Sequence, residues 1–557
     1  KPKKNDFRGC ITVHTFGVHN TRFFFSFPQL REGLQWRKCL WPCRLSVMIK
    51  RAVLRILVAM FAALCGISSV VAIELFGFQE LLKSPFPLVI VITAIAAGLM
   101  TAAMAISPAR YWQAWERRLE NVQRRLQLTT LPASHRIAWL AIIVSWFCFI
   151  LIVTQLWKVH TDATSSDPAA FLRYAKEVQE SGGVTTLLSQ LFEGTYSEAN
   201  QHPLFTALLS FGPTFSEGKL LSLAIGMLTL VFVTLWVARQ WNLTVAAIVS
   251  VILSTNFAFC STSALVTCEG LLTLWISLVW LLLASKAPAA PGASTGSASA
   301  SSGAPGFYLA TGALLGLAFL TKGTGPLFLF ITIVWIVACH FYCRRQQPSL
   351  ATPFPWKPLT MILLAWLITA SPLLTRNIRM FGNPIYNDNS YFLFLDQFED
   401  LPQVAQRMTV GEAAQQYFAE HSVTEIVQRE AQGLCWESYI FIRSFGPAPL
   451  DDSRILFGLP ILLLALAGML AERRPVALLL LAWIACFLVM FAWYLPIAAG
   501  QRFMVPLLPP LLICTATGLA RLGNGLKSRR FCHPTMAVSL ALAWSIIWTT
   551  LTCTMLP

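Results

Sequence analysis

Five charged residues stand beside long apolar segments of the sequence and could carry out chemistry together. They are one carboxylate and four cations: Asp167, Lys322, Arg376, Arg379 and Arg502. A carboxylate can take a proton from an acceptor hydroxyl. Cations can hold a phosphate as it leaves, and the planar guanidinium of arginine can bind two of its oxygens at once. The set is therefore typical of a transfer reaction in which phosphate is the leaving group.

The composition identifies the chain as an integral membrane protein. Of its 557 residues, 56% are hydrophobic and only 12% are charged, whereas soluble globular chains carry about 25% charged residues. This excludes a water-soluble multidomain enzyme, and it also excludes a disordered chain, which needs low hydrophobicity and high charge. The 14 cysteines are scattered, so neither a disulfide framework nor a zinc site is indicated.

Thirteen segments are apolar for long enough to cross a bilayer, whose hydrocarbon core needs about 20 residues per helix. They are residues 52–74, 85–106, 137–157, 219–238, 243–259, 267–285, 307–323, 326–342, 358–374, 454–471, 475–495, 503–520 and 535–554. The pattern predicts an all-α polytopic membrane protein with about 13 transmembrane helices. Gly312 and Gly316 lie on one helix face, where small residues allow close helix packing.

Two long polar loops, residues 158–218 and 375–452, fall on the same side of the membrane if every span crosses it. Together they hold 18 of the 26 acidic residues but only 8 of the 42 lysines and arginines. The opposite side collects most of the arginines, and by the positive-inside rule that side is cytoplasmic. We therefore expect both loops to be extracytoplasmic. The net charge of +16 is then an orientation signal, and no nucleic-acid partner is expected.

The remaining segments look peripheral to this core. Residues 1–47 are basic, aromatic and unpatterned, and we interpret them as a disordered tail or a misassigned start. Residues 48–136 hold two predicted helices and an amphipathic cytoplasmic segment. Residues 286–306 form a flexible cytoplasmic linker of Gly, Ala, Ser and Pro, and residues 522–557 hold the last predicted helix.

The charge distribution favours chemistry on the outer membrane face over a permeation path. A transporter keeps its polar groups at the bilayer midplane, on broken helices, whereas the predicted spans are nearly free of charge at that depth. No Gly-rich phosphate-binding loop is present, and no nucleotide pool exists outside the cell. An outer-face transferase would therefore draw its activated group from a lipid, usually a sugar on polyprenyl phosphate. The alternatives are a transporter or flippase of lipid-linked glycans and a non-catalytic membrane scaffold.

Five segments resemble motifs of the GT-C glycosyltransferases, in the same order along the chain. SSDPAAFLRYAKEVQESGG resembles their Asp-containing first loop, and QHPLFTALLSFG resembles their His-Pro-Pro segment with leucine in place of the second proline. LGLAFLTKGTGP resembles the Lys-Gly hairpin, SPLLTRNIRMFGNPIY the Arg-Asn segment, and QRFMVPLLPPLL the Arg-Tyr-x-x-Pro-x-Leu-Pro run. The resemblance covers about residues 137–521. It indicates the subgroup of protein O-mannosyltransferases, lipid A aminoarabinose transferase and bacterial lipopolysaccharide glycosyltransferases.

The resemblance implies a function for this core. It implies an inverting hexosyl- or pentosyltransferase that uses a polyprenyl-phosphate sugar as donor, and a glycolipid, polysaccharide or protein as acceptor. The expected location is the bacterial cytoplasmic (inner) membrane, with the active site on the extracytoplasmic face. No DxD motif is present, so the need for a divalent metal stays open, and no other cofactor is expected. The sequence leaves the oligomeric state open.

The same resemblance assigns roles to individual residues. It makes Asp167 the catalytic base or a metal ligand, with Asp162 as a weaker substitute. Arg376, Arg502 and Lys322 are the residues that it implies for phosphate binding.

Each of the main candidates also has a purely structural explanation. Asp167, followed by proline, could be only the N-cap of a helix. Glu269 and Lys322 stand at the outer ends of predicted helices, where the helix dipole favours their charges. For Glu269 the alternative role is an acceptor contact, and for Lys322 it is phosphate binding.

Other candidates are open in the same way. His202 is either a loop turn before a helix or a substrate contact, and Asn377 and Arg379 are lesser candidates beside Arg376. Four aromatic residues in the second loop could line a sugar or lipid groove, but an interfacial aromatic belt explains them as well. They are Tyr386, Tyr391, Phe392 and Phe394.

Overall fold

The computed structural model describes residues 135–164, 166–286, 305–346, 353–447, 454–471, 475–494, 500–525 and 534–555. Among these residues the chain is helical, and its extended segments pair only in an isolated bridge between Asn256 and Pro447. The predicted N-terminal tail, the first two predicted spans with the amphipathic segment, and nearly all of the cytoplasmic linker lie outside the described residues.

Helices cover each of the predicted spans from residue 137 onward. They are α6 (His135–Val159), α10 (Phe215–Gln240), α11 (Leu243–Ser254), α12 (Phe257–Ala264), α13 (Glu269–Lys286), α14 (Pro305–Thr321), α15 (Gly325–Gln346), α16 (Trp356–Phe381), α20 (Arg454–Ala471), α21 (Val476–Trp493), α22 (Leu508–Gly525) and α23 (Pro534–Met555). In the described part of the chain, six helical segments are long and apolar enough to cross a membrane, and α11, α13, α14, α15 and α20 hold shorter apolar stretches. The total of 13 crossings stays a prediction.

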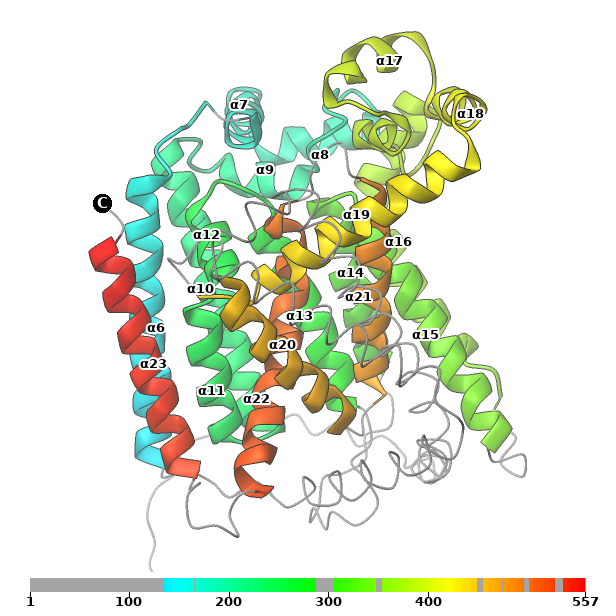
Figure 1. Cartoon of the computed structure of the whole chain (residues 1–557). Helices are drawn as coiled ribbons and strands as arrows, with labels where there is room; N and C mark the ends of the chain where they lie inside the picture. The colour runs from blue at the N-terminus through cyan, green and yellow to red at the C-terminus, as the bar shows by residue number, and fades with distance from the viewer. Residues whose placement is uncertain are drawn as a thin grey trace, which may run out of the picture.

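The helices of the two long loops gather at one end of this bundle (Figure 1). The first loop holds α7 (Ser166–Glu180), α8 (Val184–Glu193) and α9 (Pro203–Leu209). The second holds η2 (Asp388–Phe394), η3 (Phe398–Asp400), α17 (Leu401–Arg407), α18 (Val410–Glu420) and α19 (Val423–Arg443). Both loops therefore lie on the same side of the bundle, as the charge pattern predicts. Their extracytoplasmic location stays a prediction.

The prediction of a single helix over residues 243–259 is wrong, because the helix is interrupted between α11 and α12. Asn256 causes the break: its side-chain oxygen accepts from the Phe259 amide at 2.9 Å, and its amide nitrogen donates to the Ser444 carbonyl at 2.8 Å. Asparagine is among the best N-cap residues and competes with the backbone inside a helix. The break therefore starts a new helix and also ties it to the end of the second loop.

Glycines let pairs of helices in the bundle approach closely. A Cβ at Gly312 in α14 would collide with the backbone carbonyl of Ile362 in α16, and one at Gly316 would collide with Thr369. A Cβ at Gly468 in α20 would likewise collide with the carbonyl of Cys514 in α22. The close packing expected at Gly312 and Gly316 is therefore confirmed.

Candidate active site

Two carboxylates and two cations meet where the first loop joins the membrane helices, and we call Asp167, Glu269, Lys322 and Arg502 the charge cluster. Lys322 Nζ donates to Glu269 Oε1 at 2.5 Å, and Arg502 Nε lies 3.8 Å from the same oxygen. Arg502 also donates through Nη1 to Asp167 Oδ2. All four residues are sequence-predicted candidates, and the structure brings them into one connected set.

Asp167 lies in the first turn of α7, which starts at Ser166. The alternative explanation of Asp167 as an N-cap does not hold, because the helix begins one residue earlier. Its carboxylate instead accepts from Arg502, a residue 335 positions away in the sequence. A negative charge in the first turn still suits the helix dipole, but the capping role no longer explains the residue.

Glu269 and Lys322 occupy the helix ends that the sequence predicts. Glu269 is the first residue of α13, and Lys322 directly follows α14, with its amide donating to the Ala318 carbonyl at 3.0 Å. The N-terminus of one helix favours the carboxylate and the C-terminus of the other favours the ammonium. The two helix ends lie close together, so each helix dipole stabilises a member of the same ion pair.

Arg502 stands at the start of η5 (Gln501–Leu507), next to Phe503. Its guanidinium carbon lies 4.9 Å from the centre of the Phe503 ring, and Lys322 Nζ lies 4.4 Å from the same centre. A ring face attracts cations, so Phe503 helps to hold two like charges near each other. Glu269 offsets their repulsion from the other side.

The four side chains differ in how far a substrate can reach them. Glu269 is 3% exposed, whereas the side chains of Lys322, Asp167 and Arg502 are 20%, 28% and 39% exposed. Glu269 therefore lies at the bottom of the charge cluster and anchors both cations. Asp167 and Arg502 lie at its open side, where a bound molecule can reach both groups.

His202 links the charge cluster to the rest of the loops. It is the N-cap residue of α9, directly before Pro203, and its ring is buried. Nδ1 contacts the Phe319 carbonyl, and Nε2 lies 3.2 Å from the side-chain amide nitrogen of Asn387. Burial, reinforced by Arg376 and Lys322, lowers the pKa of His202 to about 4. A neutral ring that donates from Nδ1 and accepts at Nε2 satisfies both contacts.

Those contacts favour the structural interpretation of His202, and a substrate contact stays a prediction. Both ring nitrogens bind the chain's own groups, one just before Lys322 and one in the second loop. A Cβ on Gly323 would lie 3.4 Å from His202 Nε2, so the turn that carries Lys322 packs closely against the ring. His202 therefore fixes this turn in the described structure.

Arg376 and Asn377 lie outside the charge cluster. Arg376 is 1% exposed, donates from Nη1 to the Glu198 carbonyl at 2.6 Å, and has its guanidinium 5.2 Å from the centre of the Phe381 ring. Asn377 donates to the carbonyls of Pro384 and Tyr386 at 3.0 and 3.2 Å. The structure thus uses both residues to tie the end of α16 to the two loops, and places no contact between Arg376 and Arg502.

Two minor candidates have local surroundings. Asp162 Oδ1 accepts from the amide and the hydroxyl of Thr164, at 2.7 and 2.6 Å, in a short exposed turn. Arg379 is exposed near the end of α16, where its Cβ packs against Gly194 of the first loop. No contact described for either residue joins it to the charge cluster.

Three of the four aromatic candidates in the second loop form a small core, which explains them in place of an interfacial belt: Tyr391, Phe392 and Phe394. The fourth, Tyr386, is half-buried and stacks on Phe381. The Tyr391 hydroxyl donates to the Met408 carbonyl at 3.0 Å, and the Phe392 ring stacks on Phe398 at 5.1 Å. Tyr391 and Phe392 are buried together, with Phe394 packed against them. The loop folds on itself and needs this apolar core, which a hydropathy pattern does not distinguish from a membrane-facing belt.

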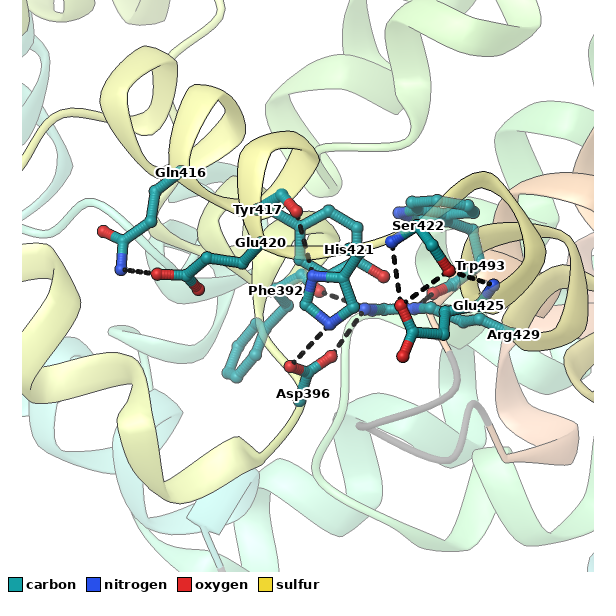
Figure 2. A network of polar contacts seen from close by, with 10 residues as sticks. All are labelled: Phe392, Asp396, Gln416, Tyr417, Glu420, His421, Ser422, Glu425, Arg429 and Trp493. Atoms are coloured by element: carbon teal, nitrogen blue, oxygen red, sulfur yellow. Dashed lines mark hydrogen bonds and ion pairs between the residues drawn. The ribbon is translucent and has the colours of Figure 1, made fainter.

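Sequence reasoning missed a second set of charged contacts, which we call the loop network: Asp396, His421 and Arg429 (Figure 2). Asp396 lies 3.3 Å from Arg429 Nη1 and 3.1 Å from His421 Nε2. Arg429 also donates from Nε to the Trp493 carbonyl at 3.1 Å and lies over the rings of Tyr417 and Trp493. The only available signal was a cation in a strongly acidic loop, and that signal marks Arg407 equally well.

Among the described residues, no three His, Cys, Asp or Glu side chains gather in a group that could hold a metal ion. The charge cluster offers two carboxylates, and each already faces a cation. As they are arranged in the described structure, these residues do not form a metal-binding set, and whether the protein needs a divalent metal stays open.

Two solved structures of membrane glycosyltransferases are similar to this chain. ArnT from Cupriavidus metallidurans bound to undecaprenyl phosphate is 15% identical, with a TM-score of 0.40, over 73% of this chain and 70% of that one. The apo oligosaccharyltransferase from Archaeoglobus fulgidus is 13% identical, with a TM-score of 0.40, over 75% of this chain and 56% of that one. Both belong to the GT-C group that the sequence motifs resemble. No protein-family model and no curated protein sequence matches the chain.

Proposed function

We propose that this protein is a membrane glycosyltransferase that moves a sugar from a polyprenyl phosphate to an acceptor hydroxyl at the outer membrane face. The observation that carries the proposal is the charge cluster. Asp167 and Arg502 are partly exposed, so a substrate can reach both. They lie directly beside Glu269 and the second cation, Lys322. The proposed setting is the bacterial inner membrane, where a lipid-linked donor would reach the cluster from the bilayer.

The proposed reaction is a single displacement with inversion. The acceptor oxygen attacks the anomeric carbon of the sugar while the bond from that carbon to the phosphate oxygen breaks. Asp167 takes the proton of the acceptor hydroxyl, and the polyprenyl phosphate leaves with the bonding electron pair. Arg502 and Lys322 stabilise the charge that develops on the phosphate.

Glu269 acts in this proposal by positioning both cations. One carboxylate oxygen faces Lys322 and Arg502 together, so the two positive groups converge on one point. An arginine and a lysine carry more N–H donors than two carboxylates occupy, which leaves donors for phosphate oxygens. Arg376 has no part in this step, because it is buried and bound to the Glu198 carbonyl.

A transfer assay tests the proposal directly. Purified full-length protein is supplied with radiolabelled polyprenyl-phosphate sugars and with lipid, polysaccharide or peptide acceptors, with and without chelator. We expect covalent transfer of label together with release of polyprenyl phosphate. The proposal is wrong if label crosses the membrane of sealed vesicles and no covalent product forms, which is the result expected of a flippase.

The outer-face location is tested separately. Ser197 in the first loop and Gln428 in the second are both exposed, and each is replaced by cysteine in turn. An impermeant thiol reagent applied to intact cells should label both variants above the background that the native cysteines give in the unchanged chain. Protection of both positions would place the loops inside the cell and overturn the donor assignment.

A further inference from the structure

A groove of about 620 Å³ lies between α19 and α21, on the second loop's side of the bundle. In Figure 1, α19 crosses the bundle obliquely from the loop end. One wall of the groove comes from α19 and the other from α21, and Leu393 also lines it. The wall from α19 is Ile426, Val427, Glu430, Ala431 and Leu434, and the wall from α21 is Val489, Met490 and Trp493. Gly433 brings the helices together, because a Cβ there would collide with the carbonyl of Ala492.

The lining of the groove is apolar apart from Glu430, its one charged lining residue. Two of the apolar lining residues are also exposed: Val427 is 61% exposed on α19 and Val489 is 52% exposed on α21. Because α21 is long and apolar enough to span a membrane, exposed apolar side chains at this site suit a surface that meets hydrocarbon.

The groove is separate from the charge cluster. Phe491 of α21 packs against Phe503, which lies beside the charge cluster, at 4.8 Å between ring centres, whereas Val489 and Trp493 line the groove. Two residues along an α-helix correspond to a rotation of about 200°. The body of α21 therefore lies between the two sites.

Glu430 supplies a polar group at this apolar site. Its Oε1 atom is buried and has no hydrogen-bond partner among the described residues. Burial raises the pKa of the Glu430 carboxyl, against the opposing effect of Arg429. In its protonated state the carboxyl can donate to a carbonyl oxygen, and the ester that joins an acyl chain to glycerol carries such an oxygen.

We propose that the groove binds one acyl chain of a membrane glycerophospholipid, with Glu430 hydrogen-bonded to the ester group at the head of that chain. Trp493 and Leu393 line the groove and also contact each other, since Trp493 Nε1 donates to the Leu393 carbonyl at 2.6 Å. Trp493 in turn accepts from Arg429 of the loop network. A bound lipid therefore fills the space under the second loop and stabilises its position. This proposal requires the membrane location but not the transferase activity.

Photocrosslinking of the full chain tests the proposal. The protein is placed in a bilayer of glycerophospholipid that carries a diazirine in one acyl chain, and the labelled peptides are mapped. Labelling should concentrate on residues 426–434 and 489–493. Ala431→Phe fills the groove and should reduce this labelling about tenfold, a change of about 1.4 kcal/mol in binding. Gln432→Phe adds the same ring at an exposed neighbouring position and should label as the wild type does.

The outcomes separate the possible occupants. Even labelling along all lipid-facing helices would overturn the proposal, and so would displacement of the probe by unlabelled polyprenyl phosphate, which would make the occupant an isoprenoid. Ala431→Leu repeats the test with a smaller side chain if the phenylalanine variant fails to fold. Asp167→Asn should label like the wild type, so a failure of the proposed transfer reaction leaves this result intact.

Discussion

The charge cluster and the loop network use the same residue types for different ends. In each, an aspartate faces an arginine beside aromatic rings. In the loop network, Arg429 donates to Asp396 and to backbone carbonyls, and its side chain is 9% exposed. In the charge cluster, Arg502 is 39% exposed and shares one of its two carboxylates, Glu269, with Lys322. The difference teaches that the surroundings of an ion pair, rather than its members, separate a structural contact from a binding site.

Asp167→Asn should have the largest effect on turnover and tests the charge cluster as a catalytic site, because it should stop catalysis while leaving the fold intact. The amide still accepts from Arg502 but cannot take a proton. A general base typically contributes about 10²–10⁴-fold, so we expect a loss of that size in turnover with labelled donor. Near-normal turnover at normal expression would show that another group is the base, and Asp162 or Glu269 would be tested next.

We expect the stability of the protein to depend on pH through His202. This residue packs against the turn that carries Lys322 of the charge cluster and does not belong to the loop network. Its folded pKa of about 4 lies below the usual value of about 6.5. The unfolded chain therefore takes up a proton between these values that the folded chain refuses. The free energy of unfolding should have its full value above pH 6.5 and fall by up to about 3 kcal/mol as the pH drops to 4.

Thermal unfolding in detergent between pH 4 and pH 7.5 measures this effect. His202→Gln, which keeps hydrogen-bonding groups but does not titrate, should have a flatter pH dependence than the wild type. If both proteins lose stability in parallel, the acid sensitivity comes from elsewhere.

Arg429→Met should reduce stability and leave turnover per folded molecule unchanged. It leaves the carbonyls of Trp493 and Phe392 without a donor, and an unpaired buried polar group costs about 1–3 kcal/mol. Arg407→Met, an exposed arginine of the same loop, is the matched control and should unfold like the wild type. A fall in turnover for folded Arg429→Met would give the loop network a catalytic role and remove the distinction between the two regions.

Ser422→Ala should have the smallest effect. Ser422 and Glu425 form a capping box at the start of α19 (Figure 2), with the Ser422 hydroxyl accepting from the Glu425 amide at 3.3 Å. Loss of such a cap costs about 1 kcal/mol. Faster hydrogen exchange confined to the first turn of α19 would confirm a local effect, whereas faster exchange at Arg429 and beyond would show that the cap supports the whole loop network.

The members of the charge cluster could be predicted from sequence because charge is conspicuous at the end of an apolar helix. Glu269, Lys322 and Arg502 stand there, and each charge needs a partner or a function, whereas Asp167 was predicted from the resemblance of its loop to the GT-C glycosyltransferases. Their mutual contacts could not be predicted, since they depend on how four distant segments pack. Arg376 shows the limit: it stands at the same level as Arg502, but α16 turns it inward, and helix periodicity alone does not show which face meets the loops.

The fold was predictable to a similar depth. Hydropathy averaged over about 20 residues finds apolar segments, and helices cover each such segment in the described part of the chain. The same averaging hides one polar residue, so the break at Asn256 was missed. The loop network was missed for a related reason, because an amphipathic loop helix gives no sign of which carbonyls its arginine will reach.

The long sequence separation within the charge cluster has a consequence for biogenesis. Glu269 is synthesised 53 residues before its partner Lys322. Asp167 is synthesised 335 residues before its partner Arg502. A charge inserted without its partner is costly in hydrocarbon, by about 2.5–3.5 kcal/mol at the centre of a helix on translocon scales. Glu269 lies at the very start of α13 and can stay at the interface until its partners emerge. The cluster is therefore completed only near the end of translation, and a chain truncated before Arg502 keeps Asp167 without its arginine.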